Sequence, residues 1–389
     1  MNRNIKLAYI LTVVKSSWFW MAIWVFYYLR FTDYAGIGLI ETIVISMTMV
    51  AEVPTGAIAD IIGRKWTVLL AFLIEGLGNL IMAASPTLGI LLISLPFLAI
   101  GSAFYSGSME ALVYDTLKEK KEENKYNRVI ANITTCTLVT YAVVAIAGGL
   151  LYQISPRLPF VVTGLFYMGG AVLSLFLREP QIDSQKFSWL VFVKQNTQGF
   201  KQLFLNKGVR RWTIYLLAVT TIAVITFEML NDILAVEFGF TPLSWSWVLA
   251  IIFIFASLVS QLGPILTNKI HKLLLFSVIT IIIGLTLFVS PWVGMVAGGI
   301  TIALRHALQF MFNNLTSGVL NEQIESSVRA TTLSTFTLLS RVPYVFLAFF
   351  IGVTMQTTGA RNFALVLGGI LIAVAFFPFL LRNYSESKH

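Results

Sequence analysis

Three kinds of residue are scarce in this chain of 389 residues: charged residues, histidine and cysteine. Charged residues make up 12% of the chain, about half of the roughly 25% that is usual in soluble domains. The single cysteine, Cys136, excludes a disulfide and a cysteine-based metal site within one chain. His271, His306 and His389 are too scattered for a metal site or a catalytic triad. Neither H-E-x-x-H nor the ATP-binding pattern G-x-x-x-x-G-K-S/T occurs, so we expect no enzyme, no metal and no cofactor.

Hydrophobic residues make up 57% of the chain, and they are arranged in long apolar runs. A membrane-spanning helix needs about 20 mainly apolar residues. The sequence contains twelve segments near that length, at 7–30, 35–59, 65–84, 87–114, 128–152, 159–178, 211–236, 243–266, 273–290, 292–320, 329–355 and 360–381. They predict an all-α polytopic membrane protein with twelve transmembrane helices.

Positive charge is distributed unevenly among the loops between these segments. If the amino terminus is cytoplasmic, the loops on that side carry 21 Lys and Arg residues, and the other loops carry only Arg30, Arg157 and Arg361. Cytoplasmic loops retain positive charge in this way, so we predict a multi-pass plasma-membrane protein with both termini in the cytoplasm. The net charge of +9 then indicates attraction to anionic lipid headgroups of the bilayer and not nucleic-acid binding.

The largest break in the apolar pattern, residues 179–210, divides six predicted helices from six. This stretch is basic but also contains Trp189, Leu190 and Phe192, a mixture typical of an amphipathic helix on the inner membrane surface. We therefore predict an N-terminal six-helix bundle at 1–178, a cytoplasmic linker with an amphipathic segment at 179–210, and a C-terminal six-helix bundle at 211–389.

A short internal repeat indicates that the two halves are related. GAIADIIGRK at 56–65 lies between the second and third segments, and GPILTNKIHK at 263–272 lies between the eighth and ninth, 207 residues later. Thr267 replaces the aspartate and Ile270 the second glycine, so the second copy is degenerate. Parallel six-helix repeats place a substrate site near the middle of the membrane between the halves.

The first copy of the repeat carries a family resemblance. Gly56, Asp60, Gly63, Arg64 and Lys65 resemble the G-x-x-x-D-x-x-G-R-K/R signature of the major facilitator superfamily, at the same place between helices two and three. The twelve helices, the long central loop and the half-repeat extend the resemblance over the whole chain. EVPTG at 52–56 and SMEALVYDTL at 108–117 are similar to sequences of the bacterial exporter-like branch. The resemblance implies two pseudo-symmetric six-helix bundles that work by alternating access.

The resemblance also implies that the signature is a latch on the cytoplasmic side. In the family, the signature aspartate, here Asp60, faces the amino-terminal end of helix eleven, whose dipole favours an anion. Here that end is ESSVRATT at 325–332, with Ser326 or Ser327 as the helix cap and Arg329 as an added partner.

A second part of the latch joins helix two to helix four. The family implies a relay from the signature arginine, here Arg64, to an acid at the inner end of helix four, a place that Asp115 matches. A simple topology anchor would explain Arg64 and Lys65 but would not explain Asp60. The gating residues are therefore predicted to be Gly56, Asp60, Gly63, Arg64, Lys65, Asp115 and Arg329.

Charged residues inside the apolar segments cost about 2.5–3.5 kcal/mol each on insertion scales, so each of them needs a reason. Those that we place in a substrate or proton cavity are Lys15, Glu52, Glu110, Glu228, Asp232, Arg305 and Arg341. Glu228 and Asp232 are four residues apart and so share a helix face. A carboxylate that is neutral at one point of the cycle can carry a proton, so this pair and Glu110 are the two candidate coupling sites.

Several of these residues have an alternative explanation. Lys15 lies roughly 12 Å along its helix, so its amine could extend to the inner membrane surface. Asp232 could lie near the outer surface in contact with water, and Glu52 could pair with a cation from the other half. Glu75 is in a helix that the family places at the periphery, so we interpret it as structural.

Two departures from the family pattern bear on function. Residues 144–149 read VAIAGG where proton-coupled exporters often have G-P-x-x-G-G, and Phe97 stands where many exporters have an arginine before a glycine. Both weaken the case for a typical drug:proton antiporter. The sequence still predicts a monomeric secondary active transporter that exports a hydrophobic or amphipathic small molecule against proton influx. The alternatives are symport or facilitated uptake of a charged metabolite, and a non-transporting receptor or scaffold on the same fold.

Overall fold

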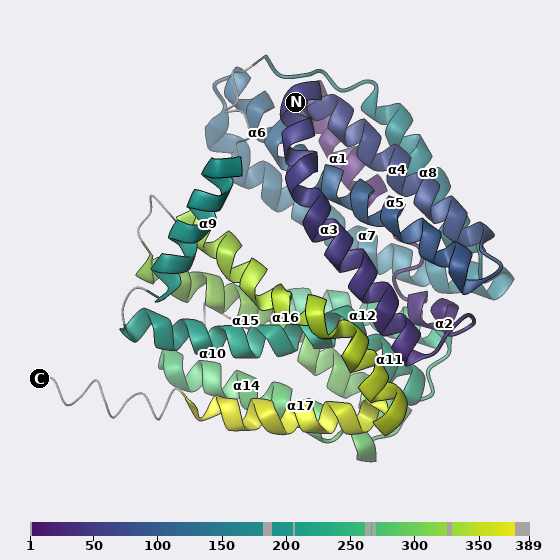
Figure 1. The fold of residues 1–389 in the computed structure, drawn as a ribbon, viewed down its shortest axis with the longest axis vertical. Helices are drawn as coiled ribbons and strands as arrows, with labels where there is room; N and C mark the ends of the chain where they lie inside the picture. Colours follow the sequence, from purple (N-terminus) through teal and green to yellow (C-terminus); the bar gives the residue numbers. More distant parts are fainter. Residues whose placement is uncertain are drawn as a thin grey trace, which may run out of the picture. The chain divides into compact units, whose positions relative to one another are not determined.

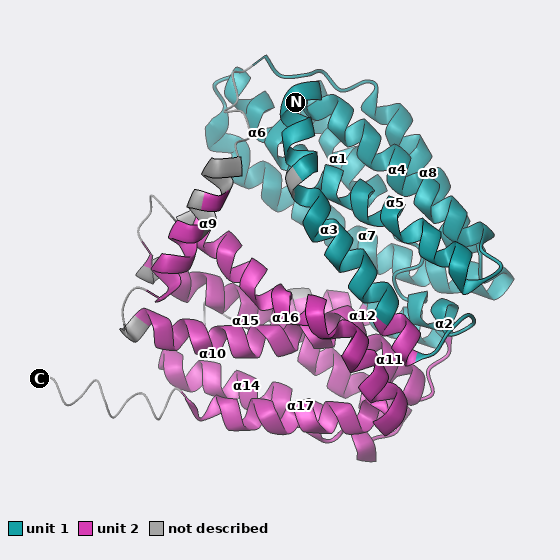
Figure 2. Ribbon diagram, in the orientation of Figure 1, with its two compact units in different colours: residues 1–33, 39–189, 242–250 teal, residues 34–38, 190–241, 251–389 magenta. Residues whose placement is uncertain are grey.

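The computed structural model of the chain describes residues 2–181, 189–204, 207–260, 266, 270–324 and 329–377. Within these ranges all regular secondary structure is helical (Figure 1). The chain divides into two compact units (Figure 2). Unit 1 comprises residues 1–33, 39–189 and 242–250, and unit 2 comprises residues 34–38, 190–241 and 251–389.

Unit 1 is built mainly from the first eight helices and one short 3-10 turn. They are α1 Arg3–Lys15, α2 Trp24–Tyr28, α3 Tyr34–Ile62, α4 Arg64–Ala84, α5 Leu88–Tyr105, α6 Ser108–Glu119, η1 Glu123–Lys125, α7 Tyr126–Ile154 and α8 Leu158–Ser174. Helix α4 packs most extensively against α5 and α8.

Unit 2 contains the remaining helices, although the first half of α12 belongs to unit 1. They are α9 Trp189–Phe204, α10 Lys207–Ile225, the π-helical turn η2 Thr226–Leu230, α11 Asn231–Glu237, α12 Pro242–Ser260, α14 Lys272–Phe288, η3 Ser290–Trp292, α15 Met295–Gln323, α16 Arg329–Thr358 and α17 Ala360–Ala375. The most extensive helix pair in this unit is α14 with α17.

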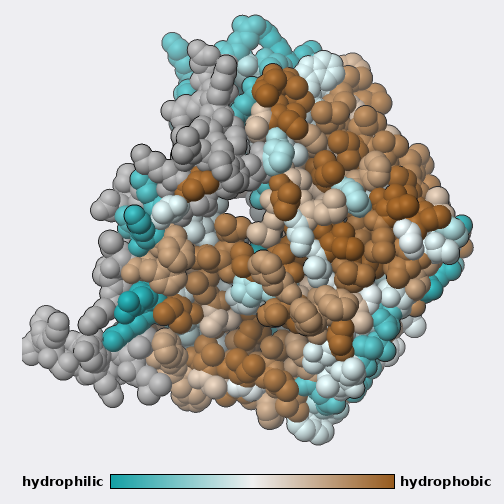
Figure 3. Space-filling view, viewed as in Figure 1, coloured by the Kyte–Doolittle hydropathy of each residue, from teal (hydrophilic) through white to brown (hydrophobic). Residues whose placement is uncertain are grey.

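The helices have the length and the surface of membrane-spanning segments. Within the described ranges, seven helical segments are long and apolar enough to cross a membrane, and four shorter apolar helices have 10–17 residues. Large apolar side chains face outward, among them Val50, Ile61 and Ile154, which are 74–83% exposed. Hydrophobic residues cover much of the face seen in Figure 3. Such surface is stable in contact with lipid, since lipid tails are themselves apolar.

Two apolar segments that we predicted as single helices are each divided in two. The segment at 7–30 forms α1 and α2, joined by turns at 16–23. In this break the backbone N–H of Phe19 donates to Thr163 Oγ1 at 3.2 Å, so a neighbouring helix supplies an acceptor that the interrupted helix lacks. The segment at 87–114 forms α5 and α6, which meet at Gly107, where φ is +73°. Hydropathy did not predict these breaks, because each lies within a run that is long and apolar enough on average for one membrane-spanning helix.

Close glycine contacts join the most extensive helix pairs of both units. Gly76 of α4 and Gly164 of α8 lie so close that a Cβ on either would be 3.1–3.3 Å from the other's carbonyl oxygen. Gly284 of α14 and Gly368 of α17 repeat this contact, with distances of 2.5–3.0 Å. Small residues allow helix backbones to approach closely where no hydrophobic force between helices exists.

A helix, α9, lies within the stretch 179–210 that we predicted as a linker with an amphipathic segment. A Cβ on Gly199 would lie 2.4 Å from Thr335 Oγ1, so α9 packs closely on α16 within unit 2. Leu203 is fully buried, whereas Phe200 is half exposed. The position of α9 on a membrane surface stays a prediction, as do the boundaries proposed for the two bundles and the linker.

Candidate functional site

The signature residues lie where α3 ends and α4 begins. Gly63 separates the two helices with φ +94° and ψ 159°, a conformation that is almost restricted to glycine. The backbone N–H groups of Arg64 and Lys65 donate to the two carboxylate oxygens of Glu179, at 2.6 and 2.7 Å. A Cβ on Gly63 would lie 2.7 Å from the Glu179 Cδ. The second glycine of the signature therefore makes room for a carboxylate that caps α4.

The charged side chains of the signature also interact with one another. Arg64 Nη2 lies 3.0 Å from Asp60 Oδ1, one helical turn earlier. Asp115, on α6, experiences the charges of Arg64, Lys118 and Glu179. The structure thus brings Asp60, Arg64 and Asp115 into one region of unit 1, with the ion pair formed by Asp60. The relay from Arg64 to Asp115 stays a prediction.

The side chains predicted for the other half of the latch lie outside the described part of the chain. Ser326 and Ser327 lie outside the described residues, and the side chain of Arg329 is likewise not described. Most of the degenerate second copy at 263–272 also lies outside the described ranges. The contact of Asp60 with helix eleven therefore stays a prediction.

Lys15 forms a buried ion pair inside unit 1. Its Nζ atom lies 2.6 Å from each carboxylate oxygen of Glu75, and the side chains are only 16% and 3% exposed. The aromatic rings of Tyr105 and Tyr167 flank the ammonium group at 5.4 and 5.3 Å. Asn79, one turn after Glu75, donates to the Glu75 carbonyl oxygen at 2.8 Å. The amine of Lys15 is thus directed into the bundle and held there by Glu75.

This ion pair lies behind a cavity of about 290 Å³ in unit 1. Its polar and charged lining residues are Thr12, Lys15, Ser16, Tyr105, Ser106, Glu110, Thr137 and Tyr141. Lys15 faces the cavity with its charge compensated by Glu75, and Glu110 is exposed to it. The charge that a bound solute would meet is therefore mainly that of the Glu110 carboxylate.

Unit 2 contains a second cavity, of about 200 Å³, at the π-helical turn η2. Glu228, on that turn, lies 3.8 Å from Arg341 of α16, and both side chains line the cavity. The amides of Gln309 and Asn313 and the rings of Phe227 and Phe310 complete much of the wall. π-helical turns occur frequently at functional sites, because the extra residue redirects the side chains that follow.

Three of the predicted cavity residues, Glu52, Asp232 and Arg305, line neither of these two cavities. Asp232 is partly buried on α11 and is not part of the lining of the Glu228 cavity. Glu52 is exposed on α3 and does not line the Lys15 cavity. The structure therefore brings together Lys15 with Glu110, and Glu228 with Arg341.

Arg305 is fully buried in the middle of α15. None of its guanidinium nitrogens has a hydrogen-bond partner among the described residues. The next residue, His306, is also buried, with Nδ1 3.3 Å from Asn231 Nδ2 and 3.2 Å from the Ile302 carbonyl oxygen. A buried cation needs a compensating anion, and Arg305 lies outside the lining of both cavities.

Three acidic residues were not among the sites predicted from sequence, because their partners are distant along the chain. Glu179 follows α8 and caps α4, whereas Glu75 pairs with a lysine 60 residues earlier. In unit 2, Glu237 accepts from the backbone N–H groups of Ala360 and Arg361 at 2.8 and 3.0 Å. Only the cost of a charge inside an apolar segment pointed to Glu75, and no local pattern pointed to Glu179.

Comparison with protein families gives one assignment for nearly the whole chain. The sequence model of the Major Facilitator Superfamily matches residues 7–341. This range contains the signature, both cavities and the two acidic caps described above.

The curated relatives are distant and are matched only in part. The chain is 26% identical over 188 residues to Multidrug resistance protein 1 of Bacillus subtilis, and 24% identical over 170 residues to the Probable nitrate transporter NarT of Staphylococcus epidermidis. These matches cover 48% and 44% of this chain. They span less than half the length of the relatives, 46% and 43% respectively.

Solved structures match the complete fold. The nucleoside transporter NupG superposes with a TM-score of 0.82 at 15% identity, covering 98% of this chain and 100% of that chain. A POT family transporter in complex with a thioalcohol-conjugated peptide superposes with a TM-score of 0.74 at 13% identity, covering 98% and 96%. At these identities the likeness concerns the fold alone, and it confirms the predicted all-α polytopic architecture.

Proposed function

The chain belongs to the Major Facilitator Superfamily and is a membrane-spanning secondary transporter, and we propose that it exports a hydrophobic or amphipathic small molecule in exchange for protons. The observation that carries the proposal is the buried Lys15–Glu75 ion pair behind the cavity that Glu110 lines. Charged groups inside membrane helices are costly and mark solute or ion pathways. We also propose that the protein moves its solute across the membrane without catalysing a chemical reaction.

The walls of the two cavities support an amphipathic solute. In unit 1 the charge of Glu110 lies among Met109, Tyr105 and Tyr141, and in unit 2 the Glu228–Arg341 pair lies beside phenylalanine rings. Apolar and aromatic walls with few charged groups bind solutes that have one polar part. The multidrug resistance protein among the relatives agrees with this solute class.

Carboxylates in both cavities support coupling to protons. Glu110 and Glu228 each line a cavity within a membrane-spanning segment, where an ionised carboxylate is expensive. Taking up a proton removes that cost, and binding a cationic group of the solute compensates for it. Proton and solute would then compete for one negative charge, and such competition produces antiport.

Proteoliposomes with the purified protein test this proposal. We expect an imposed pH gradient to drive accumulation of an amphipathic fluorescent dye, such as ethidium or Hoechst 33342, and a proton ionophore to abolish it. The Glu110→Gln protein lacks the shared negative charge, so it should bind the cationic dye more weakly and lose the dependence of transport on the pH gradient. Transport that ignores the gradient would overturn the coupling. Absence of dye transport and of solute exchange would favour the non-transporting receptor or scaffold.

The burial of Arg305 favours one second candidate, the symport or facilitated uptake of an anionic metabolite. A guanidinium without a hydrogen-bond partner among the described residues would be compensated by an anion that reaches it. The probable nitrate transporter among the relatives is consistent with this candidate. Uptake of labelled nitrate into proteoliposomes, lost in an Arg305→Gln protein, would support this candidate over dye export.

The proposed setting is a monomer in the plasma membrane with both termini in the cytoplasm. The orientation rests on the 21 Lys and Arg residues on one set of loops against three on the other. Cysteines introduced at Lys121 and at Arg157 test it, because only the second should react with an impermeant thiol reagent in intact cells. Labelling of Lys121→Cys instead would reverse the orientation.

A further inference from the structure

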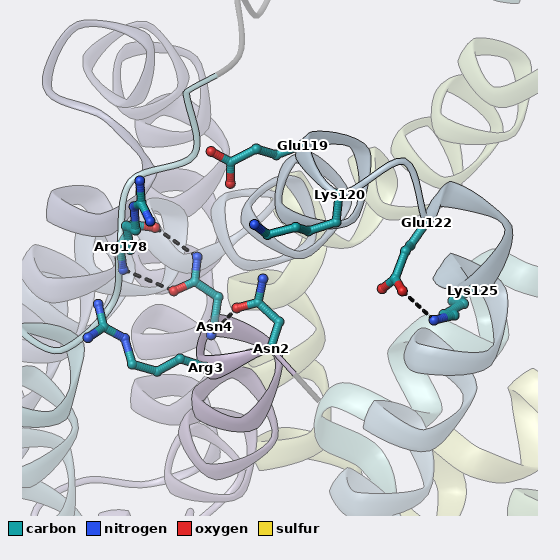
Figure 4. A pocket seen from close by; sticks show the side chains of 8 residues that line it. All are labelled: Asn2, Arg3, Asn4, Glu119, Lys120, Glu122, Lys125 and Arg178. Carbon is teal, nitrogen blue, oxygen red and sulfur yellow. Dashed lines mark hydrogen bonds and ion pairs between the residues drawn. The ribbon is translucent and has the colours of Figure 1, made fainter.

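A basic cavity lies at one end of unit 1 and shares no lining residue with the Lys15 cavity of the proposed transport path. It has a volume of about 650 Å³ and lies between the start of α1, the end of α6 with the turn η1, and the segment that follows α8 (Figure 4). This volume is within the range of small-molecule sites, about 300–1,000 Å³. All of its basic residues belong to the Lys- and Arg-rich loops.

The lining carries a net positive charge. Arg3, Lys120, Lys125 and Arg178 contribute four cations, and Glu119 and Glu122 contribute two carboxylates. Lys125 forms an ion pair with Glu122. Figure 4 shows Lys120 between this pair and the side with Arg3 and Arg178. The excess of two positive charges matches a ligand with one or two negative charges better than a polyanion.

The framework around the cavity is held by a buried amide. Asn4, only 4% exposed, donates from Nδ2 to Thr116 Oγ1 at 3.0 Å and to the Arg178 carbonyl oxygen at 2.8 Å. Its Oδ1 accepts from the Arg178 backbone N–H at 2.9 Å. This one side chain therefore joins α1, α6 and the segment after α8. The basic side chains of the cavity therefore belong to three elements that the hydrogen bonds of Asn4 hold together.

The cavity also lies at the amino-terminal end of α1. Asn2 lines it and caps the helix, with its Oδ1 accepting from the Asn4 backbone N–H at 3.0 Å. The partial positive charge of a helix amino terminus adds to the field of the four cations. The geometry of the cavity and its positive charge thus both favour the binding of an anion.

We propose that this cavity binds a phosphate-bearing group, and that the bound group ties α1 to α6 and to the segment after α8. The ligand chemistry has two possible sources, the headgroup of an anionic phospholipid of the inner leaflet and a free phosphate. Basic pockets at the cytoplasmic ends of transmembrane helices bind anionic headgroups in this way. The site is distinct from the proposed solute path, and its binding does not depend on transport.

Thermal unfolding of the purified full-length protein in non-ionic detergent tests the site. The probes are dioleoyl phosphatidylglycerol, the zwitterionic dioleoyl phosphatidylcholine, and inorganic phosphate. A ligand that binds the folded state raises the melting temperature. We expect phosphatidylglycerol or phosphate to raise it more than phosphatidylcholine, and the effect to shrink as salt increases. A shift with the lipid alone assigns the headgroup, and a shift with phosphate assigns the free ion.

A matched pair of triple variants shows where the probe binds. The first variant combines Arg3→Gln, Lys120→Gln and Arg178→Gln. It should bind the probe that stabilises the wild-type protein at least about tenfold more weakly, since each substitution removes a cation from the cavity. Lys6→Gln, Lys121→Gln and Arg128→Gln remove as many exposed charges outside the lining and should leave binding unchanged. The single variant Lys120→Gln replaces the first triple variant if that protein does not fold. Equal binding by both triple variants, or a wild-type shift no larger than that with phosphatidylcholine, would overturn the proposal.

Discussion

At the scale of single residues, carboxylates that accept backbone N–H groups set the ends of two helices. Glu179 caps α4 directly after Gly63, and Glu237 caps α17 directly after Gly359, whose φ is +84°. Both helices begin with a glycine at positive φ and have an arginine in their first two residues. An anion at a helix amino terminus satisfies free N–H groups and interacts favourably with the dipole. The Gly-Arg part of the signature thus has a structural reason that is independent of any gate.

Replacing Gly63 by alanine should destabilise unit 1 strongly. The backbone conformation is strained for any other residue by about 1–3 kcal/mol, and the new Cβ would meet the Glu179 carboxyl group. The melting temperature of the purified protein measures the effect. Gly169→Ala, on α8, is the matched control, since its Cβ would meet nothing within 4 Å and alanine favours a helix. Equal melting temperatures for the two variants would contradict this account of Gly63.

The Lys15–Glu75 pair should show the energetics of a buried ion pair. Removing one partner leaves an uncompensated charge, so Lys15→Met or Glu75→Gln alone should cost about 3–5 kcal/mol. The double variant removes both charges and should be clearly more stable than the sum of the single losses predicts. A double-mutant cycle on unfolding provides the measurement. Additive losses would mean that the two side chains act independently.

At the scale of helices, the glycine contacts reproduce the internal repeat more clearly than the signature does. Gly284 and Gly368 follow Gly76 and Gly164 by 208 and 204 residues, close to the 207-residue offset of the two signature copies. The α4–α8 contact of unit 1 therefore has its counterpart in the α14–α17 contact of unit 2. The second copy has lost the aspartate and the second glycine of the signature, while the helix contacts remain.

Valine at Gly368 should separate α14 from α17. Its side chain would collide with the backbone of Gly284 and Phe288, where even a Cβ would lie 2.4–2.5 Å from the nearest atoms. Overpacking of this kind costs about 1–3 kcal/mol. Gly369→Val, one residue later, is the control because a Cβ there meets nothing within 4 Å. A lower melting temperature is expected for the first variant only, and equal values would show that this helix contact is not tight.

The sequence predicted the helices well and their interruptions poorly. A membrane forces backbone groups to pair within each segment, so apolar runs such as 128–152 and 273–290 correspond closely to α7 and α14. The break at 16–23 and the π turn that carries Glu228 depend on neighbouring helices, which leave no local pattern. Lys15 and Glu110 could be proposed from the cost of a membrane charge, but Glu75 as the partner of Lys15 required the tertiary structure.

At the scale of the whole molecule, the two halves carry different kinds of charge. Unit 1 has a charge-compensated lysine beside Glu110, and unit 2 has the Glu228–Arg341 pair and the buried Arg305. A transporter with identical halves would present the same groups to a solute from both sides. The two units therefore differ in their charged groups, and the complete signature, on which the proposed gate rests, lies in unit 1.

The proposed gate predicts a variant that separates transport from binding. Asp60→Asn keeps the size of the side chain but removes the charge that pairs with Arg64 at 3.0 Å. If the charge of Asp60 holds the cytoplasmic side closed, its loss should slow turnover in proteoliposomes at least about tenfold, equivalent to about 1.4 kcal/mol on the barrier. Dye affinity of the purified protein should change little, because Asp60 does not line either solute cavity. Glu123→Gln removes an exposed acid next to α7 and serves as the control. Unaltered turnover in Asp60→Asn would leave the signature with only its structural role at the start of α4.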